Sequence, residues 1–494
     1  MNRREFLLAT LAGSLAGQLG CEVDPAPLLP ARTSPALDTT GLTRLARFVQ
    51  MSDTHVVDPL SPARFAEAYF VTHSVWRPYE AYAGHLADGI VRTINRVHAS
   101  GRSIDFVLHT GDACDNAQSN ELAWFLSILD GRPVNPLSGP DDRPVETRPE
   151  SGLDPYLPYL PQGLYRQGVH GALPSIPWYA LIGNHDTHCV GILPFFDQPW
   201  GGRTAPVPLQ PRPGIVLPVV FDPEADLAYG NVTPAQPGPP PIFQLPRYVA
   251  PNRDRRFFHK VDFAAGLFST QTGPLGHGLT DPAGPAWYSV SPAPGLRIIA
   301  LDSADPPVKV PNVFYVEAAM TPAQADFLRA ELDAALARDE IVLVATHHPS
   351  GGLQFALGSA IGPDGFRALL AEYPNVVAHV CGHEHVNRVI DRGQYLEILT
   401  CATIDLPQEA RLLEVYRDPR TGQASIAYEM ISHLDAALPP LGYDPFISRR
   451  EVARGIAQRD AGTPTGTARR KRFAPDVNDA ERALDRSGIW RKPA

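Results

Sequence analysis

Five short apolar runs in this chain each lead directly into a cluster of His, Asp or Asn residues. The runs have the length and the β-branched or aromatic content of buried strands. The runs and the clusters that follow them are residues 46–51 before Ser52-Asp53-Thr54-His55, residues 104–108 before His109-Thr110-Gly111-Asp112, residues 178–182 before Gly183-Asn184-His185-Asp186, residues 341–345 before Thr346-His347-His348-Pro349, and residues 376–380 before Cys381-Gly382-His383-Glu384-His385. In α/β sheets, ligands bind outside the carboxyl ends of the strands, because the chain leaves the core there and side chains can converge. The five clusters are therefore predicted to meet at one edge of the fold.

Helical patterns separate these runs. Apolar residues recur at three- and four-residue spacing over 80–98 and over a shorter stretch, 121–129, and Thr321-Pro322 supplies an N-cap and a first-turn proline for a helix over 321–337. Further strands are expected at 287–290, 296–301, 395–400, 411–416 and 424–430. This order predicts an α/β fold, a four-layer α/β/β/α sandwich of two mixed sheets flanked by helices, and not a single doubly wound sheet.

Proline marks where this pattern is interrupted. The chain has 52 prolines in 494 residues, which is about twice the usual share of about 5%, and many of them lie near 131–174 and 191–285. We interpret these two stretches as long Pro-rich insertions that cover the site, with disordered spacers as the alternative. The expected organisation is a signal peptide over 1–20, a linker over 21–45, one domain over 46–435 with both insertions, and an Arg-rich C-terminal tail over 436–494.

The first residues read as an export signal. A charged start with Arg3-Arg4 precedes Phe6-Leu7 and a short apolar run, which resembles the twin-arginine address read by the machinery that exports folded proteins. An ordinary secretory signal is the alternative. Leu19-Gly20-Cys21 resembles the end of a bacterial lipoprotein signal, although Gln18 departs from that pattern, so a lipid anchor at Cys21 and a soluble product cleaved nearby both stay open. The expected location is the periplasm or cell envelope.

The net charge and the cysteines limit which partners the chain is expected to bind and which disulfide bonds it could form. The formal net charge of −10 argues against a nucleic-acid partner, because binding to a phosphate backbone rests on clustered Lys and Arg. Beyond Cys21 the chain has Cys114, Cys189, Cys381 and Cys401. A bridge between Cys114 and Cys189 is conceivable in an oxidising compartment, but buried free thiols are the favoured interpretation.

The ordered set Asp-x-His, Gly-Asp, Gly-Asn-His-Asp, His-x-Pro and Gly-His-x-His resembles the calcineurin-like metallophosphoesterase superfamily, over about residues 47–428 without the two insertions. Together with the N-terminal signals, it suggests an exported bacterial member. The resemblance implies a phosphate-ester substrate and a binuclear metal centre. The implied ligands are Asp53, His55 and His385 for one metal, Asn184, His347 and His383 for the other, and Asp112 between them. His185, next to Asn184, would be the catalytic histidine.

The chemistry of these side chains agrees with that division. Imidazole and carboxylate ligands together suit divalent Mn, Fe or Zn better than Ca or Mg. A bridging carboxylate can hold two metal ions about 3.5 to 4 Å apart, where they generate a shared hydroxide at neutral pH and clamp the phosphoryl oxygens. An imidazole outside the metal shell can protonate the leaving alkoxide. The expected reaction is hydrolysis by a metal-bridging hydroxide with His185 as general acid.

Several assignments within the motifs stay open. The His-x-Pro pattern selects His347 as the ligand, and strand alternation would turn His348 to the opposite face, packed or exposed. Asp115, Asn116 and Asp186 could orient ligands or cap the following turns, and ligand orientation is favoured for Asp186. The run of charged residues over 253–256 could contact a substrate phosphate, although a solvated surface is the favoured interpretation.

The motifs of this chain differ from those of one related class of phosphatases. The difference argues against that class but does not identify the substrate. Purple acid phosphatases have a tyrosine ligand three residues after the bridging aspartate, where this chain has Asp115, and they lack a histidine at the position of His55. A purple iron enzyme is therefore not expected, while phosphodiesterase and phosphatase activities both stay open. The alternative function is a catalytically silent metal-binding scaffold of the same fold.

Overall fold

The computed structural model describes residues 38–61, 77–140, 148–166, 168, 174–189, 191, 196–197, 203–206, 220–221, 227–228, 247–248, 252–304, 318–353, 359–435, 437–438, 440–441, 443–461 and 483–493. The expected signal peptide, Cys21 and most of the second insertion lie outside these residues. Within the described part of the chain, every helix is too short or too polar to cross a membrane.

The first of two six-stranded sheets has the strand order β17-β16-β15-β1-β2-β3. Its strands are β1 (Thr43–Met51), β2 (Phe106–His109), β3 (Trp178–Ala180), β15 (Glu409–Arg417), β16 (Ala424–Ser432) and β17 (Ser487–Arg491). β1, β2 and β3 are parallel, and β15, β16 and β17 continue the sheet by antiparallel pairing. The carboxyl ends of the three parallel strands therefore lie at one edge.

The second sheet has the strand order β13-β14-β12-β11-β10-β9. Its strands are β9 (Tyr288–Ala293), β10 (Leu296–Ala300), β11 (Ile341–Ala345), β12 (Val376–Cys381), β13 (Arg388–Asp391) and β14 (Leu396–Leu399). The four central strands are parallel, and the edge strands β9 and β13 are antiparallel to their neighbours. Both sheets are thus mixed, as predicted.

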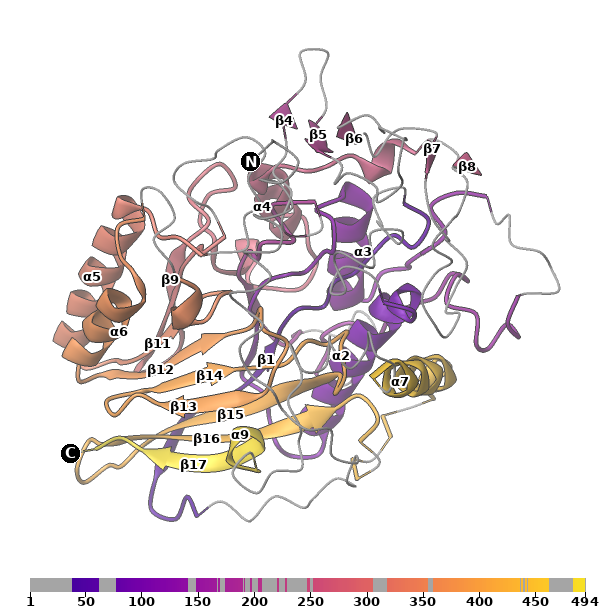
Figure 1. Cartoon of the computed structure of the whole chain (residues 1–494). Helices are drawn as coiled ribbons and strands as arrows, with labels where there is room; N and C mark the ends of the chain where they lie inside the picture. The colour runs from indigo at the N-terminus through magenta and orange to yellow at the C-terminus, as the bar shows by residue number, and fades with distance from the viewer. Residues whose placement is uncertain are drawn as a thin grey trace.

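Alternating side chains along the buried strands explain why the sheets stack. Along β11, Val342 and Val344 pack in the cluster that contains Leu328, from the helix α5 (Pro322–Ala337), whereas Leu343 packs in the larger cluster shared with the first sheet. On the far side of the first sheet, Ile90 of the helix α2 (Ala83–Ala99) belongs to that larger cluster. The layers are therefore helix, sheet, sheet and helix, which confirms the predicted α/β/β/α sandwich (Figure 1).

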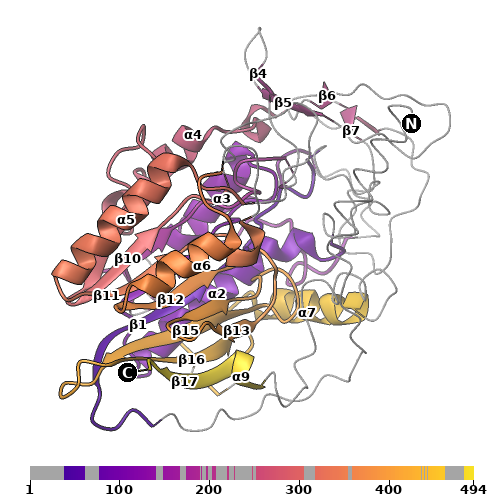
Figure 2. The ribbon, with the colours of Figure 1, turned by 60° about the vertical axis from the view of Figure 1, so that its left-hand side comes forward.

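The helices occupy the two outer layers and the loops. The α-helices are α2 (Ala83–Ala99), α3 (Ser119–Asp130), α4 (Lys260–Leu267), α5 (Pro322–Ala337), α6 (Pro363–Glu372), α7 (Ile447–Ala461) and α9 (Ala483–Arg486), and the 3-10 helices are η3 (Glu80–Tyr82), η5 (Arg253–Arg255), η6 (Leu275–Gly278) and η7 (Ser350–Gly352). Figure 2 shows α5 and α6 together against β10, β11 and β12. As predicted, α5 begins at an N-cap, since the Thr321 hydroxyl accepts a hydrogen bond from the Gln324 amide at 3.3 Å.

The second insertion contains short paired strands. They are β4 (Phe196–Asp197), β5 (Arg203–Pro206), β6 (Val220–Phe221), β7 (Leu227–Ala228) and β8 (Arg247–Tyr248), and they form a three-stranded and a two-stranded sheet. The later part of the insertion packs on the domain, because Phe263 and Leu267 of α4 belong to the main core cluster. That the insertions cover the site stays a prediction.

The region expected to be a C-terminal tail contributes to the core. β17 pairs with β16 from Ser425 to Glu429, and Trp490 packs against the main core cluster. α7 buries Ala453 and Ile456 against Leu86 of α2. The polar, Arg-rich composition concealed these elements, because β17 is an edge strand and α7 buries Arg449 and Arg450 as well as a few apolar residues.

Candidate metal centre

The polar clusters at the ends of the parallel strands converge from both sheets. The loops after β1 and β2 are joined through their backbones, since the amides of Asp53 and His55 donate to the carbonyls of Gly111 and Asp112 at 3.0 Å each. The loop after β12 joins them, because the His383 amide donates to the Asp53 carboxylate at 3.1 Å. The structure therefore brings together side chains that lie more than 300 residues apart in the chain.

Asp53, His55, Asp112 and His385 place four ligand atoms within 4.8 Å of one another, and all four side chains are buried. His385 Nε2 lies 3.2 Å from Asp53 Oδ1, and His55 Nε2 lies 3.6 Å from Asp112 Oδ2. These are the residues that the resemblance assigned to one metal together with the bridging aspartate. Their positions fit that assignment.

The imidazole rings of His55 and His385 point their Nε2 atoms toward each other. His55 Nε2 and His385 Nε2 are 3.2 Å apart, while their Nδ1 atoms donate to the carboxylates of Asp115 at 2.9 Å and Asp405 at 2.6 Å. A neutral imidazole whose Nδ1 carries the proton has only a lone pair at Nε2. When both rings are neutral, two lone pairs face each other and repel, so a cation, either a proton or a metal ion, would stabilise this geometry.

Asn184, His347 and His383 form a second group beside the first. Asn184 Oδ1 lies 2.9 Å from His347 Nε2 and 3.1 Å from His383 Nδ1, and its amide nitrogen donates to the Gly191 carbonyl at 2.9 Å, which turns the oxygen inward. His347 Nδ1 donates to the Thr110 carbonyl at 2.8 Å. When His347 is neutral, the lone pair at its Nε2 points toward oxygen atoms, an arrangement that again suits a cation, either a proton or a metal ion.

Asp112 lies between the two groups. Its Oδ2 atom is 3.6 Å from His55 Nε2 and 3.2 Å from His347 Nε2, while its Oδ1 atom accepts the backbone amide of His185 at 2.8 Å. Burial alone would raise the pKa of Asp112, but the neighbouring histidines, chiefly His347, hold it well below its ordinary value. The ionised carboxylate thus occupies the position expected of a bridging ligand.

The pKa values of the candidate histidine ligands depend on burial and on the charged groups beside them. Burial would lower the pKa of His385 and His347, but nearby aspartates outweigh it and raise each to about 9. Burial and the neighbouring His185 lower the pKa of His55 to about 4. His385 and His347 attract a proton strongly, and a metal ion bound at either side chain would compete with that proton.

His185 is held at the edge of the centre. Its Nδ1 donates to the Asp115 carbonyl at 2.7 Å, and its ring meets the His55 ring edge-on at 4.4 Å between centroids. The side chain keeps 14% of its surface exposed, whereas those of His55 and Asp112 are almost fully buried. Since a carbonyl only accepts, Nδ1 carries the proton, and Nε2 is the nitrogen that can exchange a proton with a ligand.

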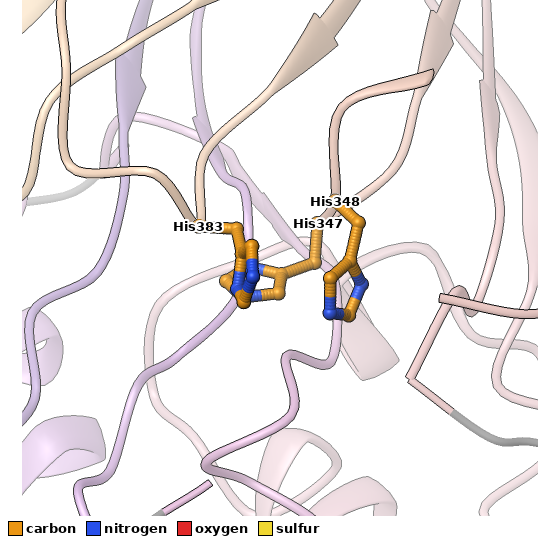
Figure 3. A group of neighbouring side chains, drawn as sticks. All are labelled: His347, His348 and His383. Carbon is orange, nitrogen blue, oxygen red and sulfur yellow. The ribbon is translucent and has the colours of Figure 1, made fainter. Parts of the chain in front are cut away.

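His348 differs from the prediction that it faces away from His347. β11 ends at Ala345, so strand alternation does not extend to these two residues, and ligand atoms of His347, His348 and His383 lie within 4.8 Å of one another (Figure 3). The His348 ring packs on the His383 ring at 4.3 Å between centroids. Its Nδ1 is bonded to the Ser303 hydroxyl at 2.9 Å, and its buried Nε2 has no hydrogen-bond partner among the residues that the structure describes.

The three polar residues left open have different roles. Asp115 accepts from His55 and so orients a candidate ligand. Asp186 accepts the backbone amides of Ala113 at 3.2 Å, Cys114 at 2.9 Å and Gly183 at 2.9 Å, and thereby ties the Asp112 loop to the Asn184 loop. Burial and Asp112 raise the pKa of Asp186 to about 7. Asn116 instead bonds to Glu121 at the start of α3.

Two further expectations concern residues near the centre. Cys114, Cys189, Cys381 and Cys401 are buried free thiols, as favoured. In the charged run over 253–256, Arg255 is fully buried and pairs with Asp58 at 2.9 Å. The interpretation of that run as a solvated surface was wrong for Arg255, because its charge is matched inside the protein.

Sequence reasoning missed Arg77, Tyr79 and Asp405. The Asp405 carboxylate accepts from His385, from the Tyr79 hydroxyl at 2.7 Å, and from Arg77 at 2.7 and 2.9 Å. Burial alone would raise the pKa of Asp405, but Arg77 and His385 hold it well below its ordinary value. Asp405 and Arg77 belong to no motif, so only their contacts in the fold reveal them.

The backbone at the candidate ligands is unusual. Five of these residues have positive φ although they are not glycine, and their φ values are 51° at Asp53, 42° at His55, 54° at Asp112, 66° at His383 and 56° at His385. Such conformations are uncommon for residues with a Cβ atom. They concentrate at functional sites, where the surrounding structure maintains them.

Comparison with known proteins identifies one family that matches this chain and several solved structures that are similar to it at low sequence identity. The family described as Calcineurin-like phosphoesterase matches residues 46–387, which is more than half of the chain. No curated protein sequence matches. Similar solved structures include a dimetal phosphatase from Danio rerio, with 13% identity, a TM-score of 0.40, and coverage of 79% of this chain and 98% of that one. GAP50, the anchor in the inner membrane complex of Plasmodium, has 10% identity, a TM-score of 0.36 and coverage of 85% and 96%.

A putative 5′-nucleotidase from Staphylococcus aureus, in complex with alpha-ketoglutarate, has 12% identity and a TM-score of 0.32, and the match covers 82% of this chain and 57% of that one. The family match spans the five strand-end clusters up to His385. The converging Asp and His side chains at those strand ends agree with it. This chain belongs to the calcineurin-like phosphoesterase family.

Proposed function

We propose that this chain hydrolyses a phosphate ester with two divalent transition metal ions, Mn, Fe or Zn, and with His185 as general acid. The observation that carries the proposal is the pair of imidazole nitrogens, His55 Nε2 and His385 Nε2, that face each other at 3.2 Å with their Nδ1 protons engaged elsewhere. Membership of the phosphoesterase family supports the class of reaction.

The side chains divide the work of holding the metals and the substrate. When bound, two divalent ions would lower the pKa of a water molecule and neutralise phosphoryl oxygens. The residues that would hold them are Asp53, His55 and His385 at one site, Asn184, His347 and His383 at the other, and Asp112 at both. His185 and His383 are only partly buried, so the phosphate would approach on their side.

His185 is placed to protonate the leaving group. Its Nδ1–H is bonded to the Asp115 carbonyl and its backbone amide to Asp112, so both the ring and its loop are oriented by the residues around the centre. A protonated Nε2 could transfer its proton to the alkoxide oxygen as the P–O bond breaks. The same nitrogen can contact a phosphoryl oxygen before that step.

Release of p-nitrophenol from bis(p-nitrophenyl) phosphate and from p-nitrophenyl phosphate tests this function. The mature chain would be reconstituted with Mn, Zn or Fe beside an Asp112→Asn variant. We expect metal-dependent turnover that the variant lacks. Preference for the diester would identify a phosphodiesterase, and preference for the monoester a phosphatase.

The alternative is a catalytically silent metal-binding scaffold. It predicts two bound metals and no turnover of either ester, or of a wider panel of phosphate esters, by the wild-type chain. The complete set of candidate ligands together with an oriented His185 favours the enzyme, because a scaffold has no use for a proton donor at the edge of the centre.

We also propose that the protein is exported to the periplasm or cell envelope, on the basis of Arg3-Arg4 and the apolar run after them. Expression of the full chain in a bacterium, followed by fractionation, tests this. Replacing both arginines by lysine should leave the protein in the cytoplasm if the twin-arginine machinery exports it. Labelling with a fatty acid that is lost in Cys21→Ala would demonstrate the lipid anchor.

A further inference from the structure

Arg77 contacts two carboxylates at the back of one candidate metal site. Its guanidinium forms a bidentate pair with Asp405, with Nε to Oδ1 at 2.7 Å and Nη2 to Oδ2 at 2.9 Å. Its third nitrogen, Nη1, lies 3.7 Å from Asp115 Oδ1. The side chain is 2% exposed, so these interactions take place away from water, where a charge needs close partners.

Each of those carboxylates orients one histidine of the same site. Asp405 Oδ2 accepts from His385 Nδ1 at 2.6 Å, and Asp115 Oδ1 accepts from His55 Nδ1 at 2.9 Å. The two imidazoles then present their Nε2 atoms to each other at 3.2 Å. Arg77 therefore joins both carboxylate–histidine pairs.

Charge balance gives the reason for an arginine at this position. Two buried carboxylates, Asp115 and Asp405, lie beside the Arg77 guanidinium here, and charges buried away from water need such a partner. Without the guanidinium, neither carboxylate would be held in place to accept the imidazole N–H of the histidine that it orients. The planar guanidinium matches both carboxylates at once, which a lysine ammonium cannot do with the same geometry.

The other candidate site has a different support. His347 Nδ1 donates to the Thr110 backbone carbonyl, and Asn184 is held by the Gly191 carbonyl. These contacts do not involve Arg77 or its two carboxylates. A change at Arg77 should consequently affect one metal site and spare the other.

We propose that Arg77 is a positioning residue that sets the orientation of His55 and His385, and hence the affinity of the metal site built from Asp53, His55, Asp112 and His385. The inference rests on the proposed binuclear centre. Loss of a partner that orients a ligand typically weakens metal binding by about 10- to 100-fold. That is the size of effect expected for one of the two metals in Arg77→Met.

Equilibrium dialysis against Mn²⁺ with metal analysis of the full chain measures the two sites directly. The wild type should bind two Mn²⁺, and Arg77→Met should bind one as before and the second about 10- to 100-fold more weakly. Electron paramagnetic resonance adds a second readout, since the signal of two coupled Mn²⁺ ions should give way to that of one isolated ion. Arg77→Lys should fall between the wild type and Arg77→Met.

Arg450 supplies a matched control. This residue of α7 is also 2% exposed, and it pairs with an aspartate, Asp444, with Nη1 to Oδ1 at 3.2 Å. Arg450→Met therefore removes a buried arginine without touching the histidines, and it should bind two Mn²⁺ like the wild type. If Arg77→Met does not fold, Asp405→Asn tests the same array with almost no change in shape.

Wild-type affinity for two Mn²⁺ in a folded Arg77→Met or Asp405→Asn variant would overturn the inference. Equal weakening of both sites, or the same loss in Arg450→Met, would also overturn it, because the effect would then be a general loss of stability. Failure of the proposed function is distinct. It would appear as two tightly bound Mn²⁺ in the wild type without hydrolysis, while the loss of one site in Arg77→Met still held.

Discussion

The backbone at Gly191 passes so close to the centre that a side chain there would collide with it. A Cβ atom would lie 2.3 Å from His185 Nε2 and 2.5 Å from Asn184 Nδ2, and φ is +73°. No motif includes this glycine. Although Gly191 comes several positions after the Gly-Asn-His-Asp cluster, it leaves the space that the side chains of His185 and Asn184 occupy.

Gly191→Ala should lower kcat for phosphate-ester hydrolysis by about 10²-fold, because displacements of about 1 Å at reacting groups have effects of this size. Gly422→Ala is the control, since Gly422 has nearly the same φ, +74°, and open space around its Cα. Steady-state kinetics of both variants separate the collision from backbone strain. Equal activity in the two variants would show that contact with His185 and Asn184 does not matter.

His185 itself offers a test of the general-acid role. In His185→Asn the side-chain amide can still donate to the Asp115 carbonyl in place of Nδ1, but the proton-exchanging Nε2 is gone. We expect kcat to fall by about 10² to 10⁴ for esters with poorly leaving alkoxides, with two metals still bound. Esters of p-nitrophenol should lose much less, since that leaving group needs no proton. An equal loss for both kinds of ester would contradict the role.

At the scale of elements, a buried histidine of η6 contacts β3, an edge strand of the first sheet. The His277 ring stacks on the Trp178 indole of β3 at 3.5 Å between centroids, and its Nδ1 donates to the Trp178 carbonyl at 2.9 Å. Burial lowers the pKa of His277 from 6.5 to about 4. The neutral imidazole is therefore part of the folded structure.

This shift predicts acid sensitivity. With a folded pKa below the unfolded one, the contribution of His277 to stability is complete above about pH 6.5 and is lost as the pH falls toward 4. The loss should reach about 2 kcal/mol at about pH 5. Urea unfolding at about pH 7.5 and about pH 5 measures it, and His277→Asn, which does not titrate, should lose less stability between the two. An unchanged difference would contradict the assignment.

The elements that could be predicted are those with local signals. The strands before the five clusters are continuous apolar runs, and α5 begins at a Thr-Pro pair, so short stretches of sequence suffice for them. β17 and α7 could not be predicted in this way, because each depends on a partner elsewhere in the fold. The Arg77–Asp405 pair spans 328 positions, and no periodicity connects residues so far apart.

The same distinction applies within the centre. Motif order sufficed to predict which side chains would gather there. It could not give the orientation of His348, since strand alternation no longer holds once β11 has ended. Nor could it show that Arg255 is buried, because its partner Asp58 is 197 positions away.

At the scale of the whole molecule, the candidate centre joins the two sheets. Asp53, His55 and Asp112 follow strands of the first sheet, and His383 and His385 follow β12 of the second. Metal ions held by ligands from both sheets would resist their separation. Binding to the folded state alone contributes about 2.7 kcal/mol for each site when the free metal is at about 100 times its Kd.

Removal of the metals should therefore lower the thermal stability of the protein. We expect differential scanning calorimetry with a chelator to show a Tm several degrees below that of the Mn-loaded chain, with recovery after metal is added back. Asp112→Asn, which lacks the shared ligand, should respond much less to either treatment. An identical Tm with and without metal would show that the centre does not link the sheets.

The positive φ values at Asp53, His55, Asp112, His383 and His385 have a consequence for the evolution of this protein. Each such residue costs of order 1 kcal/mol that a glycine at the same position would avoid. A library selected for thermal resistance alone would accumulate glycine or asparagine at these positions and would lose the centre with each gain. Natural sequences that retain all five Asp and His residues would accordingly be under selection for the chemistry of the centre. That selection would act against the gain in stability that a glycine at each position would bring.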